Sequence, residues 1–224
     1  MARTRGLRRF SAFLVEEGLA PRDALETLKS PKVDVKVPAG VTDDQLRAMI
    51  ATCDKTTFEG CRDEALIRLM AESMVRASEA LSILLDDVDL RSGTAIVRRG
   101  KMGRGRIIQF GSSTARSLDR MIRKRKRTKG ADLPSLFVST RGSAQMSYEA
   151  LHKVISKRSA LAGFKLKPHT LRSHSAIKAL RSGMTPNSVM TLAGWQSSAM
   201  LARYVAAAST QIALDEARKL DLGL

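Results

Sequence analysis

The chain has 224 residues, 43% of them hydrophobic, so it is long and apolar enough to bury a core. This excludes a disordered chain and a fibrous repeat. Its 39 lysines and arginines outweigh 22 aspartates and glutamates, and the formal net charge of +17 predicts a polyanionic partner.

The sequence contains no apolar run near the roughly 18 residues that a membrane span needs, and its arginine-rich start leads into no signal-type segment. We therefore expect a cytoplasmic protein with no membrane partner. The two cysteines, Cys53 and Cys61, have no second pair and no histidine at ligand spacing, which argues against zinc and against a disulfide framework. Both are interpreted as ordinary core thiols.

The first part of the chain is predicted to be helical. Residues 1–30 have the apolar spacing of one or two helices, and residues 30–40 have the composition of a linker. Thr42 and Gln45 have the spacing of a capping box, so a helix should begin there. A second helix is expected over residues 59–72.

The middle of the chain changes to β-type patterns. The runs 93–99 and 104–110 are β-prone and flank a glycine-containing segment, which predicts a hairpin with Lys101 in its turn. Helical patterns then return to the end of the chain. The fold class is therefore mainly α with a small antiparallel β-sheet. The later helices are expected over residues 115–127, 148–161, 171–180, 186–193, 200–206 and 212–220.

Charge is concentrated in one segment. Between Arg98 and Lys129 there are thirteen basic residues and one acid, whereas Val41 to Ala95 carries eleven acids and six bases. A surface polarised in this way is typical of a nucleic-acid clamp. For the run 123–127, a solvated helix end favoured by the helix dipole is the alternative.

Several motifs fall in a recognisable order. They are Arg76 with Glu79, Lys101 in the hairpin turn, His169-x-x-Arg172, Gly194-Trp195, and Tyr204. Each is weak alone, but in this order on a basic chain they resemble the catalytic set of the tyrosine recombinase (phage integrase) family. The match to the catalytic domain of that family runs from about residue 42 to 204. The resemblance divides the chain into residues 1–36, a partial core-binding (SAM-like) helical segment and linker, and residues 41–224, a catalytic domain with a C-terminal helix.

The resemblance implies a phosphoryl-transfer reaction without a metal or another cofactor. Tyr204 would attack a DNA phosphodiester and form a 3′-phosphotyrosine. Arg76 and Arg172 would hold the non-bridging oxygens through charge-assisted hydrogen bonds. Lys101 would protonate the leaving 5′-oxygen, so that bond energy is kept and the strand can be rejoined without ATP.

Three more residues complete the implied set. His169 would act as a hydrogen-bond donor to phosphate or as a base toward the tyrosine proton, and Trp195 would add its indole N–H while packing its ring. Glu79 would support the site by orienting its neighbours. Tyr148 competes with Tyr204 as the nucleophile, and His152 and His174 are interpreted as structural.

Basic residues around this set are expected to bind DNA. Three of them, Arg99, Arg104 and Arg106, also compete with Lys101 for its role. The expected DNA-binding residues are Arg98, Arg99, Arg104, Arg106, Arg123, Lys124, Arg125, Lys126 and Arg127.

Two positions depart from the family pattern. The family usually has glycine where this chain has Met74, and histidine where it has Ser173. Neither departure removes a reacting group. The first half of the core-binding domain, which helps to clamp the duplex in the family, has no counterpart in these 224 residues. Its loss should lower the affinity for DNA.

The resemblance implies a site-specific DNA recombinase that integrates or excises a mobile element in a bacterial or phage-infected cytoplasm, on the nucleoid. Its partners would be double-stranded DNA and further copies of itself in a tetramer, with room for an accessory DNA-bending or directionality protein. The alternatives are an inactive or accessory DNA-binding protein of the same fold, a topoisomerase-like relaxing enzyme, and a generic basic architectural protein.

The end of the chain has an apolar stripe at helical spacing, formed by Ile212, Ala213, Ala217 and Leu220. In the family such a segment docks on a neighbouring protomer, and residues 206–209 would be the crossing segment here. The alternative is that the helix packs on its own domain.

Overall fold

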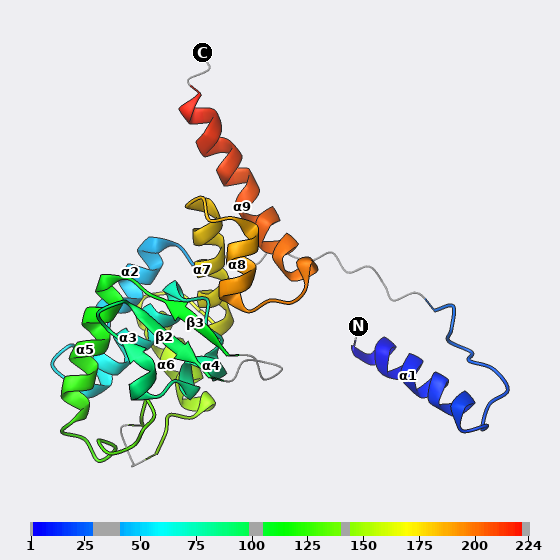
Figure 1. Cartoon of the computed structure of the whole chain (residues 1–224), viewed down its shortest axis with the longest axis horizontal. Coiled ribbons are helices and arrows are strands. Elements are labelled where there is room, and N and C mark those ends of the chain that lie inside the picture. The colour runs from blue at the N-terminus through cyan, green and yellow to red at the C-terminus, as the bar shows by residue number, and fades with distance from the viewer. Residues whose placement is uncertain (1, 29–40, 99–104, 140–143, 221–224) are drawn as a thin grey trace. The chain divides into compact units, whose positions relative to one another are not determined.

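The computed structural model describes residues 2–28, 41–98, 105–139 and 144–220. The chain consists of two compact units, Met1–Lys36 and Val37–Leu224 (Figure 1). The expected linker over residues 30–40 lies outside the described residues, and so do Arg99, Lys101 and Arg104. Within the described ranges, no helix is long and apolar enough to cross a membrane.

The first unit is built on helix α1 (Ala2–Glu16). The chain turns back after the helix, where the Asp23 carboxylate accepts hydrogen bonds from the Ser11 hydroxyl at 2.5 Å and the Leu25 N–H at 2.9 Å. These bonds, led by that from Ser11, lower the pKa of Asp23. The side chains of Leu7, Phe10 and Phe13 are exposed, so the apolar face of the helix is not covered within this unit.

The second unit is mainly helical with a small antiparallel sheet, which confirms the expected fold class. The sheet has the order β1-β2-β3, with Ala95 opposite Ile108 and Val97 opposite Arg106. The two-residue strand β1 was not expected from the sequence because it is too short to show alternation. The elements are α2 (Asp43–Ala51), α3 (Phe58–Glu72), α4 (Ala77–Ser82), a 3-10 turn (Leu85–Asp87), β1 (Val88–Asp89), β2 (Thr94–Val97), β3 (Arg106–Gln109), α5 (Ser112–Arg125), α6 (Tyr148–Leu161), α7 (Pro168–Arg181), α8 (Pro186–Ala193) and α9 (Ser198–Lys219).

Helix boundaries follow local capping chemistry. The capping box is confirmed, since the Thr42 hydroxyl accepts from the Gln45 N–H and the Gln45 side chain accepts from the Thr42 N–H. Residues 200–206 and 212–220 were expected to be separate helices, but α9 is continuous through them. Residues 206–209, the expected crossing segment, lie within this helix, because alanines favour helix rather than break it.

Helix α3 lies at the centre of the second unit and packs against both α5 and α7. It is buried around most of its circumference, and a first apolar cluster surrounds it together with the sheet and α6. A second cluster joins α7, α8 and α9 and contains both Trp195 and Tyr204. Two of the expected site residues are therefore also core residues.

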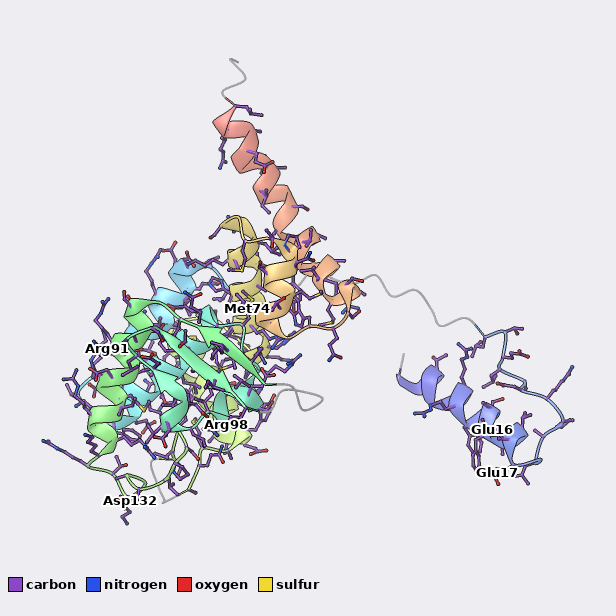
Figure 2. The ribbon with its side chains drawn as sticks, in the orientation of Figure 1. Glu16, Glu17, Met74, Arg91, Arg98 and Asp132 are labelled. Atoms are coloured by element: carbon purple, nitrogen blue, oxygen red, sulfur yellow. The ribbon has the colours of Figure 1, made fainter. Side chains whose placement is uncertain are left out.

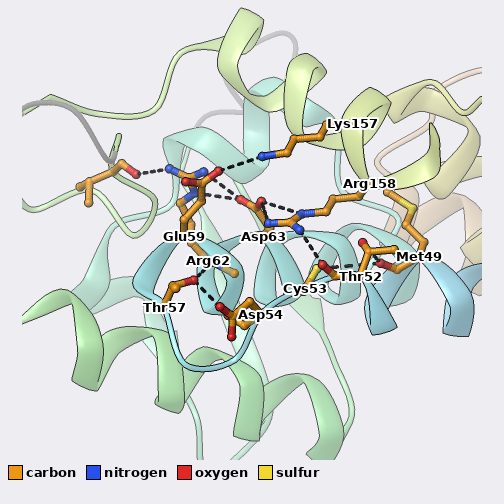
Figure 3. A network of polar contacts seen from close by, with 12 residues as sticks. Met49, Thr52, Cys53, Asp54, Thr57, Glu59, Arg62, Asp63, Lys157 and Arg158 are labelled. Carbon is orange, nitrogen blue, oxygen red and sulfur yellow. Dashed lines mark hydrogen bonds and ion pairs between the residues drawn. The ribbon is translucent and has the colours of Figure 1, made fainter. Parts of the chain in front are cut away.

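A buried ionic network fixes α3 to α6 (Figure 3). Asp63 accepts from Arg62 at 2.8 Å and from both Nε and Nη2 of Arg158, at 2.9 and 2.7 Å. The two arginines donate in addition to the carbonyls of Val138 and Thr52. Because Asp63 and the two carbonyls together accept from both arginines, the network is tolerated in the core, whereas removal of one partner from a buried ion pair destabilises a protein by about 3–5 kcal/mol.

Both cysteines are buried free thiols, as expected. Burial raises the pKa of Cys53 to about 11 and also raises that of Cys61, so neither is a reactive thiolate at neutral pH.

Candidate active site

The turn between α3 and α4 places Arg76. Met74 adopts a left-handed backbone conformation with φ of 53° (labelled in Figure 2). This conformation costs an L-residue about 1–2 kcal/mol, and a glycine, which the family usually has here, would take it freely. The Met74 side chain is buried in the second apolar cluster, which offsets the strain. The sharp turn makes Arg76 the N-cap of α4.

Glu79 joins three arginines. Its buried carboxylate accepts from Arg76 at 2.6 Å to Oε1, and from the Arg76 N–H at 2.8 Å to Oε2. Arg106 binds both oxygens, at 3.0 and 2.8 Å, and Arg172 Nη1 lies 3.8 Å from Oε2. Burial alone would raise the pKa of Glu79, but the hydrogen bonds from Arg106 and Arg76 outweigh it and hold the pKa at about 2. Glu79 is therefore ionised throughout the neutral range.

The C-terminus of α8 anchors the same three arginines. Arg106 Nε donates to the Leu192 carbonyl at 2.9 Å, and Arg172 Nη2 donates to the next carbonyl, of Ala193, at 2.7 Å. Arg76 Nη2 donates to the carbonyl of Gly194 at 3.2 Å. The last carbonyls of a helix have no partner inside it and carry partial negative charge, so they favour cations.

Gly194 ends α8 in a left-handed conformation with φ of 63°. A Cβ atom at this position would lie 3.3 Å from Arg106 Nη1, which is tighter than ordinary contact. Gly194 is therefore favoured here both by its backbone conformation and by the approach of an arginine.

Arg172 is the most buried of the three arginines, with 3% of its residue surface exposed. Its guanidinium lies 5.5 Å from the centre of the Trp195 ring, and its Nη1 is buried without a hydrogen-bond partner. Burial, followed by the charge of Arg76, lowers the pKa of Arg172 to about 10, so it stays protonated at neutral pH. A buried cationic N–H without a hydrogen-bond partner is suited to an anionic ligand.

His169 lies in the first turn of α7, where Pro168 begins the helix. Desolvation at its position lowers the pKa of His169, and the charges of Arg172 and Arg76 lower it further. The imidazole is therefore neutral at pH 7, so it can donate through one ring nitrogen and accept through the other.

Tyr204 lies on α9 and stacks on Trp195, with the ring centres 4.5 Å apart and the planes at 16°. It is 1% exposed, and its hydroxyl lies 3.4 Å from the Ser173 hydroxyl. Ser173, one of the two residues that depart from the family pattern, thus contacts the phenol oxygen.

A cleft of about 260 Å³ runs along these residues. Tyr204 is not part of its wall, whereas Tyr148, the competing nucleophile, is half exposed and does line it. The structure thus brings Arg76, Arg172, His169 and Trp195 together at the cleft. Tyr204 is buried beside them and does not line the cleft. The cleft is lined by Val75, Arg76, Ala77, Ser78, Tyr148, Pro168, His169, Arg172, Trp195 and Met200.

A larger cavity of about 350 Å³ lies between α3, β3, α7 and α8. Its polar wall includes His174, whose Nδ1 donates to the Val41 carbonyl at 2.6 Å. Burial is the main cause that lowers the pKa of His174, as expected for a structural histidine. Among the described residues, no buried unpaired polar side chain lines this cavity, so we place the site at the smaller, arginine-lined cleft.

The expected DNA-binding residues lie in different surroundings. Arg106 belongs to the arginine cluster, and Arg98 is exposed beside the buried Asp87. Lys126 and Arg127 follow the end of α5 and are exposed. Two cations on α5 are engaged, Arg123 with Asp119 and Lys124 with the Thr56 carbonyl.

The expectation for Arg125 is wrong in this structure. Arg125 is 2% exposed, and its guanidinium donates to the carbonyls of Gly130 and Leu133, so it holds the turn after α5 instead of facing a phosphate. Helix α5 as a whole packs on α3, and none of its residues lines the arginine-lined cleft.

Two guanidiniums, a neutral histidine and an indole line the cleft of this mainly helical unit, and such a set is suited to an anionic ligand such as a phosphate. The family model for the phage integrase family matches residues 40–211. The chain therefore belongs to the phage integrase family.

Curated relatives of this chain are named tyrosine recombinases. The tyrosine recombinase XerD of Neisseria meningitidis serogroup B is 28% identical over 190 residues, which cover 84% of this chain and 65% of that protein. XerD of Ralstonia nicotianae is 32% identical over 193 residues, which cover 84% of this chain and 62% of that protein. The chain thus spans less than two thirds of the length of these relatives.

Solved structures show the same fold. XerA recombinase has a TM-score of 0.66 at 23% identity, and the match covers 91% of this chain and 70% of that one. A lambda integrase dimer bound to a core site has a TM-score of 0.69 at 18% identity and covers 90% of this chain and 70% of that one.

Proposed function

We propose that this chain is a site-specific DNA recombinase that cleaves and rejoins strands through a 3′-phosphotyrosine at Tyr204. One observation carries the proposal furthest: Arg172 Nη1 is buried without a hydrogen-bond partner beside a cleft that Arg76 and His169 also line. A phosphodiester in the cleft supplies the missing acceptor, and its developing charge is stabilised by both guanidiniums.

The proposed chemistry assigns one role to each of these side chains. The Tyr204 oxygen forms a bond to phosphorus as the bond from phosphorus to the 5′-oxygen breaks. Neutral His169 accepts the tyrosine proton, which its lowered pKa permits, and Lys101 gives a proton to the leaving oxygen. Trp195 donates its indole N–H to the phosphate, and its ring stacks on that of Tyr204. Because Tyr204 is buried, its end of α9 must move before attack.

Covalent trapping tests the proposal. The protein is incubated with a pool of nicked duplexes of random central sequence, and a protein–DNA adduct resistant to denaturation is expected. Sequencing of the trapped DNA shows whether the sites lie at the ends of a mobile element, as integration or excision requires. Absence of any adduct, with DNA binding intact, would reject the enzyme.

A second candidate is a DNA-binding protein of the same fold without strand transfer. The burial of the Tyr204 hydroxyl outside the cleft wall favours it. The same trapping experiment separates the two, because a non-catalytic protein binds the duplex pool but leaves no adduct.

The role of Lys101 gives a separate prediction. Lys101→Ala should cleave ordinary DNA slowly but cleave DNA with a sulfur in place of the leaving oxygen at nearly the wild-type rate. A thiolate leaves without a proton, so the general acid is no longer needed. Rates on both substrates are compared in single-turnover cleavage, and equal defects on the two would exclude Lys101 as the acid.

The end of α9 is proposed to link protomers in a tetramer on DNA. Ile212 packs on the second apolar cluster in its own domain, whereas Leu214 and Leu220 are exposed beyond it. Removal of residues 214–224 should therefore leave the melting temperature nearly unchanged but reduce the size of the assembly on DNA, measured by sedimentation. A truncated monomer that unfolds would show that the segment packs on its own domain.

A further inference from the structure

Arg106 is bound on three sides at the start of β3. Nε donates to the Leu192 carbonyl at 2.9 Å, and the two terminal nitrogens donate to the two oxygens of Glu79 at 3.0 and 2.8 Å. The side chain is 12% exposed and does not line the cleft. Only the planar fork of an arginine can make this set of bonds.

With Arg106 in place, Glu79 has few positions left to accept another donor. Oε1 receives Arg76 Nη1 and Arg106 Nη1, and Oε2 receives the Arg76 N–H and Arg106 Nη2. A carboxylate offers about four lone-pair sites. The third cation that faces Glu79, Arg172, stays 3.8 Å away, and its Nη1 has no hydrogen-bond partner.

We propose that Arg106 is a positioning residue that fills the acceptors of Glu79 and thereby keeps Arg172 Nη1 free for a phosphate oxygen. Without Arg106, the buried carboxylate loses two donors, and among the described residues Arg172 can replace them by moving less than about 1 Å to hydrogen-bond distance. Arg172 Nη1 would then hydrogen-bond Glu79 and no longer be available to a phosphate oxygen. The inference rests on the proposed function only in taking the natural anion to be a DNA phosphate.

The chain carries its own reporter for this site. Trp195 is the only tryptophan, and its ring lies 5.5 Å from the Arg172 guanidinium. Its fluorescence can be titrated with inorganic phosphate at constant ionic strength, without a target sequence or strand cleavage. Arg106→Met should bind phosphate about tenfold more weakly or worse, because one hydrogen bond from a charged group is lost.

Arg68→Met is the matched control. Arg68 also donates to a buried carboxylate, that of Glu64 at 2.9 Å, but it lies on α3 and does not line the cleft. It should bind phosphate like the wild type. Equal phosphate affinity in Arg106→Met and Arg68→Met would overturn the inference, and so would a wild-type protein whose Trp195 fluorescence does not respond to phosphate.

Two further variants separate positioning from simple loss of charge. Arg106→Lys keeps the charge and should keep the fold, but a single ammonium cannot bond both oxygens and the Leu192 carbonyl, so we expect weakening of roughly threefold or more. Glu79→Gln should restore phosphate binding to Arg106→Met by a larger factor than it changes the wild type, because a neutral amide no longer draws Arg172 inward. Wild-type affinity in Arg106→Lys, or purely additive effects, would show that only charge matters.

These measurements test the positioning role of Arg106 separately from the recombinase activity. A wild-type protein that binds phosphate and shows these couplings but forms no DNA adduct would reject the recombinase and leave the role of Arg106 intact. A wild-type protein that forms the adduct, together with Arg106 variants that bind phosphate normally, would support the recombinase and reject the role of Arg106.

Discussion

Tyr204→Phe should bind DNA with nearly the wild-type affinity and form no covalent adduct. The substitution removes one oxygen and keeps the ring that stacks on Trp195 at 4.5 Å. Among the described residues, the hydrogen bond lost is the 3.4 Å contact with Ser173, whose hydroxyl keeps its bond to the His169 carbonyl at 3.2 Å. The variant should therefore fold normally, and only the nucleophile is missing.

Tyr148→Phe is the control for this experiment, because Tyr148 lines the cleft and is the competing nucleophile. It should still form the adduct. Trapping on the duplex pool, together with a binding isotherm for each variant, measures both effects. An adduct that persists in Tyr204→Phe and disappears in Tyr148→Phe would reassign the nucleophile.

Arg172→Ala should lower the rate of cleavage by about a hundred- to a thousandfold. Loss of one charged donor to a developing oxyanion costs roughly 3 kcal/mol or more. Arg172 is the donor with the greatest expected effect, because its Nη1 is buried and has no hydrogen-bond partner. Single-turnover cleavage at saturating DNA gives the rate independently of affinity.

Stability must be measured beside the rate in this variant. Arg172 also donates to the Ala193 carbonyl at 2.7 Å, and a buried acceptor left unpaired costs about 1–3 kcal/mol. Arg172→Lys keeps a charge and should fold, but it cannot reproduce the fork, so it should stay slow. A near-normal rate in either folded variant would remove Arg172 from the site.

Local patterns in the sequence were sufficient for much of the fold. Helices α6 and α8 have the bounds that their spacing predicts, and the capping box of Thr42 marks the start of α2. Capping and turn chemistry act over a few residues, so they can be read from neighbours in the chain. Likewise, the order of the arginine, histidine, tryptophan and tyrosine motifs along the chain is sufficient to indicate a common site.

Other features depended on contacts between distant segments. Arg106 and Arg125 are both basic residues in the charged segment, yet one binds Glu79 and α8 while the other caps carbonyls of the following turn. The spacing of residues likewise does not predict the left-handed backbone of Met74 or the burial of Tyr204.

By itself, the sequence determined the helical fold class, the basic character and which residue types could carry out phosphoryl transfer. Only the tertiary structure decided which arginines face the cleft and which hold the protein together. The reason is physical: burial and the partner of a charged group depend on what packs around it, and Leu192, Ala193 and Gly194 lie over eighty residues from Arg106 and over a hundred from Arg76.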